Sequence, residues 1–430
     1  MPGEICLFVE YFQISALNTN FDMLIEFAVT NYRSIRERQS LSLRASGQIN
    51  PKDHPDQLIQ PSDKSHGGAL IRAGVLYGAY ASGKSNILKG LNALSEMVTS
   101  SDQFKLDKNI PFYEPFRLDL GSRSLPTVFE IDFIAKDGHR YRYWVEFDQK
   151  TILREELSFF PTGGRISRAK NLFRRVLGAS IDFGEDYRGK RSFTILDNQL
   201  LLSRAGLESL PSLTEAYRFF STYLQCIATD DFSESTMFQI VSETILSDPE
   251  WEKHKTALVS LVKAADTSIS GIFVEQLDDW QINLPENLRA RWGESIRVPK
   301  RNIKTIHPVI HNGNEVDETI FDLKDESTGT IKFLGAAAYI VSALFSGATI
   351  IIDELDKNLH PLLTRMLVNL FHNPDANPHS AQLIFSSHDV SLITGSYSVG
   401  IRYISWTKAL MALRPLAACP ILQAFLRWPH

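Results

Sequence analysis

A glycine-rich segment near residue 80 has the residue types and spacing that a phosphate group requires. It fits the pattern G-x-x-x-x-G-K-[ST] and, with the residue that follows, consists of Gly78, Ala79, Tyr80, Ala81, Ser82, Gly83, Lys84, Ser85 and Asn86. Glycines let backbone N–H groups converge on an anion, and the helix expected after them adds the partial positive charge of its N-terminus. We expect Lys84 to reach the β/γ-phosphate oxygens and Ser85 to offer its hydroxyl to Mg²⁺. The alternative is an ordinary glycine-rich turn between a strand and a helix.

An acidic pair far downstream could complete such a site. The apolar run from Ala348 to Ile352 predicts a buried strand, and it ends in Asp353 and Glu354. In this position Asp353 would hold Mg²⁺ through water, and Glu354 would orient or deprotonate the attacking water. By itself such a pair is more often a solvated strand end or a helix cap, but the upstream phosphate loop favours the magnesium site.

Two further features distinguish families of P-loop ATPase. Ser327, Thr328 and Gly329 precede an expected helix at 331–345, where a hydroxyl and a glycine could bind a γ-phosphate presented by another subunit. The simpler interpretation is that Ser327 or Thr328 caps the helix. His388 ends an apolar strand, where a histidine is commonly structural; after the two earlier motifs it is better interpreted as a switch that hydrogen-bonds γ-phosphate.

The elements around these motifs predict an α/β core. Short strands are expected at 23–32 and 69–77, a helix at 85–97, and an antiparallel meander at 127–160 that turns at Asp137-Gly138. Residues 211–290 lose strand character and predict helices, for instance at 251–265. From residue 306 the chain is expected to run strand, helix, strand, helix, strand. The fold class expected is therefore an α/β P-loop NTPase core with an antiparallel β meander and a helical insertion.

The order of these motifs resembles the ABC-type ATPases of the Rad50/SMC/RecF kind. The chain is most similar to bacterial AAA-type ATP-binding proteins of the abortive-infection and restriction-associated (RloA-like) group. The opening F-x-V-x-N-Y-R-S-I from Phe27 and the stretch Pro115-Phe116-Arg117 also match that group. The sequence departs from the pattern of the group at Tyr80 and Ala81, where relatives often have Asn and Gly or Ser. Its signature segment also differs from that of ABC transporters.

The resemblance implies ATP and Mg²⁺ as cofactors and roles for particular residues. Ser327–Gly329 would be the signature loop, Asp356 the D-loop acid and His388 the switch, in a homodimer that encloses ATP at its interface. It also implies a role in defence against phage or foreign DNA, with a separately encoded nuclease or effector. Two alternatives stay open: a RecF-like DNA-repair ATPase, and a nucleotide sensor without useful turnover.

Composition bounds these expectations. The 430 residues allow two or three domains, or one core with an insertion, and 45 basic against 50 acidic residues give a net charge of −5. No global attraction to nucleic acid follows, although basic clusters at 165–175 and 289–304 could make nonspecific contacts with it. Three distant cysteines (Cys6, Cys226 and Cys419) suggest neither a disulfide framework nor a zinc site, so we expect a cytoplasmic protein.

One apolar run is long enough for a membrane span. It extends from Phe333 to Ile352, but polar residues interrupt it and its second half is β-branched. A buried helix that stops at Gly347, followed by a buried strand, is the better interpretation, so no membrane contact is expected.

Five segments are expected along the chain. Residues 23–210 would form the N-terminal half of the ATPase core, 211–305 the helical insertion, and 306–395 the C-terminal half. Residues 1–22 lack the pattern that begins at Met23, and we expect them to be a non-native extension. Residues 396–430 contain no acidic residue, and they include an apolar stretch with two prolines. We expect a frameshifted tail there, which would impair hydrolysis.

Overall fold

The structure is a computed structural model of the chain. It describes residues 21–46, 51–61, 63, 66–78, 83–162, 168–185, 194–206, 208, 210–227, 251–266, 268–283, 295–357 and 359–389. The expected tail at 396–430 and nearly all of the expected extension at 1–22 lie outside these residues. The chain divides into two compact units. Among the described residues, we call 21–226, 351–353 and 382–389 the sheet unit, and 227–350 with 354–381 the arm unit.

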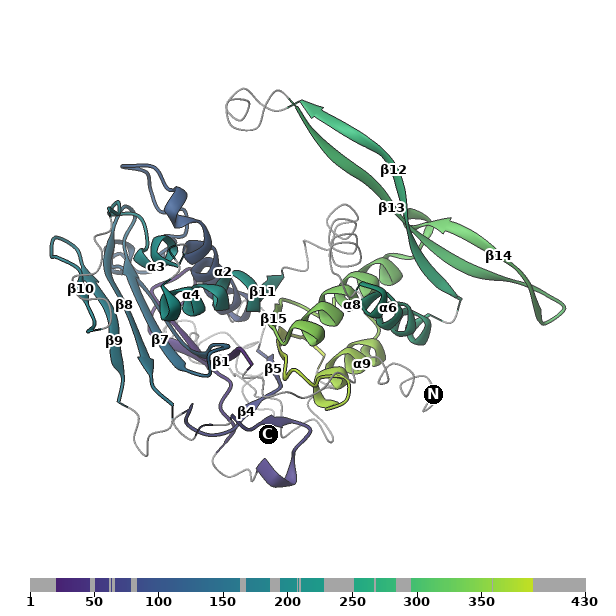
Figure 1. The fold of residues 1–430 in the computed structure, drawn as a ribbon, viewed down its shortest axis with the longest axis horizontal. Coiled ribbons are helices and arrows are strands. Elements are labelled where there is room, and N and C mark those ends of the chain that lie inside the picture. Colours follow the sequence, from purple (N-terminus) through teal and green to yellow (C-terminus); the bar gives the residue numbers. More distant parts are fainter. Residues whose placement is uncertain are drawn as a thin grey trace, which may run out of the picture. The chain divides into compact units, whose positions relative to one another are not determined.

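A seven-stranded antiparallel sheet dominates the sheet unit (Figure 1). Its strand order is β10-β9-β8-β7-β6-β1-β2. The strands are β1 (Met23–Thr30), β2 (Gln39–Ser42), β6 (Thr127–Ile134), β7 (Arg140–Phe147), β8 (Ile152–Phe160), β9 (Lys170–Val176) and β10 (Asp182–Phe183). β6, β7 and β8 confirm the expected meander, and Gly138 adopts the positive φ of 78° that its turn requires.

Alternation along these strands decides which face is buried. Phe129 and Phe133 on β6 and Tyr141 and Tyr143 on β7 are buried, as the period of two predicts. Phe133 stacks on Phe219 with ring centroids 4.1 Å apart, so the apolar face packs directly against the helical layer. The other face carries charged side chains.

Helices cover the apolar face of this sheet (Figure 1). The longer elements are α2 (Lys84–Ser100), α3 (Leu201–Ala205), α4 (Pro211–Arg218) and the π-helix η5 (Phe219–Tyr223). Short 3-10 turns occur at η1 (Pro51–Asp53), η3 (Ser101–Gln103) and η4 (Ser122–Ser124). Ten residues of α2 are buried, including Ile87, Leu91 and Leu94, and they recur at the spacing of one helix face.

A smaller sheet contains the strands that precede the glycine-rich motif, Asp353 and His388. It consists, in order, of β11 (Leu224–Ile227), β15 (Thr349–Ile352), β16 (Gln382–Ser386) and β5 (Ala73–Leu76). β5 and β16 are parallel, with Val75 paired to Phe385. The strand expected at 69–77 is divided, because β4 (Leu70–Ile71) pairs instead with β3 (Leu58–Ile59).

In the described part of the arm unit, three helices pack together: α6 (Trp251–Ala265), α8 (Thr328–Ser346) and α9 (Pro361–His372). α6 packs on α8, where the rings of His254 and Phe345 lie 3.9 Å apart. α8 ends at Gly347, whose φ is 74°, and β15 follows at once. The predicted buried helix and strand are both confirmed.

The expected helical insertion is wrong in its second part. Helices occupy 211–218 and 251–265, but β12 (Gly271–Asn283), β13 (Ser295–His311) and β14 (Asn314–Asp322) form a three-stranded antiparallel sheet (Figure 1). A register shift between Leu277 and Trp280 interrupts the period-two pattern of β12, and for this reason the sequence did not predict a strand there. The 3-10 turn η7 (Leu323–Asp325) links β14 to the signature segment. The expected segment boundaries stay predictions.

Among the described residues, α8 is long and apolar enough to cross a membrane by length and composition alone. Of its most apolar window, 56% is buried within the protein. This burial favours a core helix, as the sequence predicted.

Candidate nucleotide and magnesium site

The N-terminus of α2 has the backbone that an anion site requires. Gly83 precedes the helix with φ 93°, a conformation that other residues rarely adopt, and none of the described side chains caps the helix. A Cβ at Gly83 would come within 3.0 Å of Ser34 Oγ, so space as well as φ favours glycine. The first turn is therefore open to a ligand that accepts hydrogen bonds.

Lys84 reaches back to the first residue of the glycine-rich motif. Its side chain is largely buried, and Nζ donates a hydrogen bond of 2.6 Å to the carbonyl oxygen of Gly78, the first residue of the motif. The amine is thus held beside Gly78, where a phosphate oxygen could take the carbonyl's place. The middle of the loop, residues 79–82, lies outside the described residues, so the expected contributions of Ala79, Tyr80, Ala81 and Ser82 stay predictions.

Two hydroxyl groups and a carboxylate meet beside this helix. Ser85 Oγ donates to Asp353 Oδ1 at 3.1 Å, although 268 residues separate the two. Ser386 Oγ, from the end of β16, donates to the same oxygen at 2.5 Å. The structure therefore brings the two predicted metal-site residues together. Sequence analysis missed Ser386, although it lies only two residues before His388, at the end of the same apolar strand.

His388 follows β16 and lies beside the strand that leads into the glycine-rich loop. The N–H of Ser387 donates to Leu76 O at 3.3 Å, and the hydroxyl of Tyr77 donates to Asp389 O at 2.5 Å. The residues on both sides of His388 are therefore attached to the end of β5, while its own side chain is exposed. This placement is compatible with the switch role, which stays a prediction.

The N-Y-R-S-I segment contacts the start of α2, and sequence analysis assigned it no role. Asn86 Nδ2 donates to Ser34 Oγ at 2.6 Å. Arg33, with φ 51°, forms an ion pair of 2.7 Å with Glu114. Burial alone would lower the pKa of Arg33, but its hydrogen bond to Glu114 raises it overall. The match of the segment that begins at Phe27 to the family pattern was the sequence signal that could have indicated this contact.

Glu354 has a strained backbone. Its φ is 55°, which for a residue with a side chain costs on the order of 1–3 kcal/mol and is most often retained at functional sites. The carboxylate forms an ion pair with Lys357, with Nζ 3.1 Å from Oε2. Its predicted role as the base stays a prediction.

The signature residues cap a helix in the arm unit. Ser327 Oγ accepts a hydrogen bond of 3.0 Å from the N–H of Thr330, as the simpler interpretation predicted. Ser327 and Thr328 are exposed, and Gly329 is half-buried, so all three can be approached from outside. Contact with a partner's phosphate stays a prediction. His360, next to Pro361, likewise caps α9 through Leu362 N–H at 3.2 Å.

The chemistry of the donor set fits Mg²⁺. Magnesium prefers oxygen ligands and is usually held by one or two carboxylates together with substrate phosphates, rather than by a full protein cage. Asp353 and Ser85 supply such oxygens. Within the described residues, no group of three or more His, Cys, Asp or Glu side chains could hold a metal ion. The oxygens around Asp353 thus suit a metal shared with a phosphate.

A family model described as AAA domain, putative AbiEii toxin, Type IV TA system, matches residues 75–394. The match runs from β5 through the glycine-rich loop, Asp353 and His388. The chain belongs to this AAA family. The resemblance seen in the sequence is thereby confirmed, as are the α/β P-loop fold class and the assignment to an ATP-binding, ATPase-type protein.

Distant likenesses to solved structures accompany this AAA family match. An Smc head bound to the C-winged helix domain of ScpA has a TM-score of 0.40 at 10% identity, covering 89% of this chain and 94% of that one. The recombination mediator RecF with ATP has a TM-score of 0.38 at 11% identity, covering 89% of this chain and 96% of that one. A Pyrococcus furiosus Smc head bound to a ScpA domain has a TM-score of 0.38 at 10% identity, covering 94% of this chain and 100% of that one. No curated protein matches significantly.

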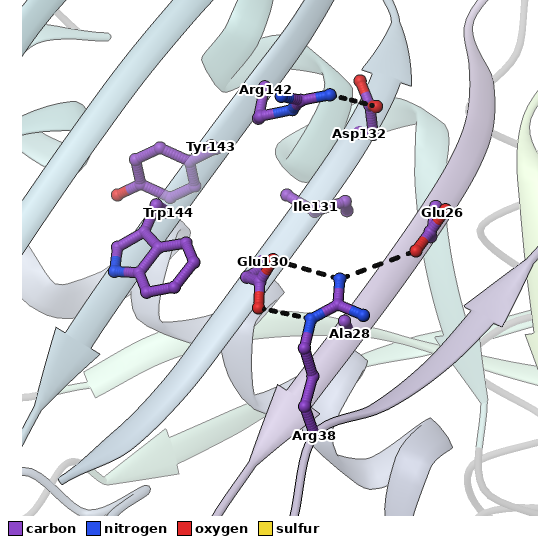
Figure 2. A pocket seen from close by; sticks show the side chains of 9 residues that line it. All are labelled: Glu26, Ala28, Arg38, Glu130, Ile131, Asp132, Arg142, Tyr143 and Trp144. Carbon is purple, nitrogen blue, oxygen red and sulfur yellow. Dashed lines mark hydrogen bonds and ion pairs between the residues drawn. The ribbon is translucent and has the colours of Figure 1, made fainter.

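A hollow of about 380 Å³ in this AAA-family chain lies on the charged face of the large sheet, opposite the helical layer. Figure 2 shows Arg38 reaching Glu26 and Glu130, and Arg142 reaching Asp132. The hydrogen bond with Glu130 raises the pKa of Arg38. Because its charges satisfy one another and the motif residues do not line it, this hollow is not part of the nucleotide site.

The basic clusters considered for nucleic acid are only partly described. In the first, Arg174 pairs with Glu156 at 2.5 Å, and Arg175 is buried beside Glu155. These two side chains are therefore engaged within the protein. Residues 163–167 and 284–294 lie outside the described residues, so nucleic-acid contact stays a prediction.

Proposed function

We propose that this chain hydrolyses ATP at the α2 N-terminus and does so with Mg²⁺. The observation that carries the proposal is the hydrogen bond of 3.1 Å between Ser85 and Asp353, beside a helix that no described side chain caps. Membership of an ATPase family supports the same reaction. An ordinary glycine-rich turn explains neither the buried lysine nor the distant carboxylate.

The proposed roles follow from where the side chains lie. Lys84 exchanges its bond to Gly78 O for phosphate oxygens and balances their charge. Glu354 aligns and deprotonates the attacking water, and His388 contacts the γ-phosphate. Ser85 and Asp353 hold Mg²⁺, which when bound neutralises charge that develops on the phosphates. Catalysis is then mainly positioning and electrostatics.

We also propose that two chains enclose two nucleotides. In this arrangement the exposed Ser327, Thr328 and Gly329 of one chain complete the site that begins at the other chain's glycine-rich loop. ATP would favour the closed dimer, and hydrolysis would release it. The exposure of these residues at the start of α8 supports the proposal.

The biological role proposed is cytoplasmic defence against phage or foreign DNA, through a separately encoded effector. The family description, which names a putative AbiEii toxin and a type IV toxin–antitoxin system, supports this role. The test is whether loss of Lys84 abolishes protection in cells challenged with phage. Protection by the Lys84→Ala chain equal to that of the wild type would contradict it.

Two substitutions test the reaction. Lys84→Ala should lose ATP affinity, because the charge beside the phosphates is removed. Glu354→Gln should bind ATP but hydrolyse it at least about a hundredfold more slowly, since general-base catalysis commonly contributes that much. Nucleotide binding and phosphate release are measured with and without Mg²⁺. Glu252→Gln, at an exposed acid on α6, is the control and should behave as wild type.

The results also separate the alternatives. Wild-type hydrolysis by Glu354→Gln would show that the base is assigned wrongly. Tight ATP binding without hydrolysis by the unmodified chain would favour the nucleotide sensor. Affinity for duplex DNA that rises with ATP and falls steeply with salt would favour the RecF-like alternative.

A further inference from the structure

Two exposed segments hold most of the large apolar side chains that face solvent. Of the 12 such side chains among the described residues, 3 lie in residues 117–125, which we call the leucine loop, and 5 in residues 309–321, which we call the acidic hairpin. Leu118 and Leu120 are 88% and 78% exposed. Exposed apolar side chains that gather in one segment mark interaction surfaces more often than scattered single residues do.

The leucine loop is held firmly despite its exposure. Asn31 Nδ2 donates to Ser122 O at 3.0 Å and to Leu125 O at 2.7 Å. Asp119 Oδ2 accepts hydrogen bonds from the N–H and hydroxyl of Ser122, at 2.9 and 2.8 Å. The loop therefore presents its leucines in a preorganised form, which lowers the entropic cost of binding.

The charges around these leucines are mainly basic. Arg117 and Arg123 are exposed and form no ion pair with an acid among the described residues, whereas Asp119 is paired with Arg36 at 3.6 Å. A partner for the loop should therefore be apolar and acidic.

The acidic hairpin has that chemistry. Its exposed apolar side chains are Val309, Ile310, Val316, Ile320 and Phe321. Val309 stands opposite Asp317, and Ile310 stands opposite Glu315. There is no Lys or Arg between Thr305 and Leu323. Among the described residues, Glu315 and Asp317 form no ion pair.

The same acids make pairing between two hairpins unfavourable. β14 is an edge strand of its sheet, so its outer backbone groups could add a further strand. Two β14 edges would place acids against acids, which is destabilising. A basic apolar surface is the better match, and the chain carries one in the leucine loop.

We propose that the acidic hairpin of one copy docks on the leucine loop of a second copy. This interface goes beyond the proposed nucleotide sandwich, since it uses neither the motif residues nor ATP. The contact joins two different patches, so a two-fold dimer would contain it twice. If the geometry did not close, the same contact would extend into longer assemblies.

Mixed chains that each carry one introduced cysteine test the contact between copies. One chain carries Leu120→Cys and the other Val316→Cys, both with Lys84→Ala and without nucleotide, so that the ATP sandwich contributes nothing. Cys6 and Cys419 are changed to Ser; Cys226 stays, because burial raises the pKa of its thiol. Mild oxidation should give a disulfide-linked dimer of the two chains. Leu106→Cys, at a leucine 65% exposed outside the loop, is the matched control and should link several-fold more slowly.

Charge reversal then tests the chemistry. Arg117→Glu on the loop chain, or Glu315→Lys on the hairpin chain, should each slow the linkage several-fold, and the two together should restore it. Neither side chain makes a hydrogen bond or ion pair among the described residues, so folding should be unaffected. Linkage no faster than the Leu106 control, or insensitivity to both reversals, would overturn the proposal. So would a chain with both cysteines that forms only an internal disulfide.

Discussion

At the scale of single residues, the acidic pair has an unusual backbone and an unusual hydrogen-bond pattern. Glu354 holds a positive φ without being glycine, and Asp353 receives two hydroxyl donors on one oxygen. The two hydrogen bonds fix the direction of the Asp353 carboxylate, whereas the backbone of Glu354 is held at a cost in free energy. Strain of this kind is retained where a particular side-chain direction is needed.

Another buried carboxyl makes folding depend on pH. Burial, followed by repulsion from Glu215, raises the pKa of Asp22 from 3.8 to about 7, although Lys136 opposes the shift. The folded state therefore holds a proton that the unfolded chain has released above pH 4. Stability should fall as pH rises from about 4 to about 7, by at most about 1.4 kcal/mol per pH unit from this group, and then level off.

Asp22→Asn should remove this loss, because its amide stays neutral at every pH. The measurement is urea unfolding at pH 5 and pH 8, and the stability of the variant relative to wild type should be greater at pH 8 than at pH 5, because wild type loses stability between these pH values. Asp53→Asn, at an exposed acid, is the control and should leave the difference unchanged. An equal pH dependence in the Asp22→Asn chain would show that this carboxyl is not buried as described.

At the scale of elements, a buried network joins three strands to α3. Glu155 on β8 is fully buried and accepts hydrogen bonds from the Tyr143 hydroxyl at 2.8 Å and from the N–H of Leu201 at 2.7 Å. Arg175 Nη1 lies 3.7 Å from its carboxylate. Burial raises the pKa of Glu155, whereas the hydrogen bonds and Arg175 favour its charged form.

Glu155→Ala should therefore destabilise the protein by about 3–5 kcal/mol, because Arg175 would be left as a buried charge without its partner. Glu156→Ala is the matched control on the next residue: of its partners, Arg154 is half-exposed and Arg174 is exposed, so the loss should stay below about 1 kcal/mol. Chemical denaturation followed by circular dichroism measures both. Similar losses for the two variants would contradict the network's importance.

Elements with local signals were predictable from the sequence. α8 has a serine cap and a terminal glycine, and the meander has strict alternation, so both were placed correctly. β12 was missed because its bulge breaks the alternation and its pairing with β13 is not local. A signal for the neighbouring hairpin was present: Asn312-Gly313, both with positive φ, is a typical two-residue turn.

The candidate site was predictable only in its composition. Motif spacing indicated Lys84, Ser85 and Asp353, since a phosphate loop and a strand end carry recognisable residue types. The contact of Ser386 with Asp353 and that of Ser34 with Asn86 depend on how distant strands and loops pack together. The positive φ of Glu354 has no sequence signal, because glutamate rarely adopts it.

At the scale of the whole molecule, the motifs are divided between the two units. The glycine-rich loop, Asp353 and His388 belong to the sheet unit, and the signature residues at 327–329 belong to the arm unit. If two chains complete each other's sites, a defect in the loop of one chain and a defect in the signature of the other fall in the same composite site. The second site of that heterodimer then stays intact.

Mixing a Ser327→Arg chain with a Lys84→Ala chain should therefore recover ATP hydrolysis that neither shows alone. With random pairing about half of the dimers are heterodimers, and each has one working site, so recovery should reach at most about a quarter of wild type. Because Ser327 also caps α8, Ser327→Ala is the control: it loses the cap, about 1 kcal/mol, without blocking the site. No recovery, with heterodimers verified by affinity tags on each chain, would mean that one chain holds its nucleotide site without a partner.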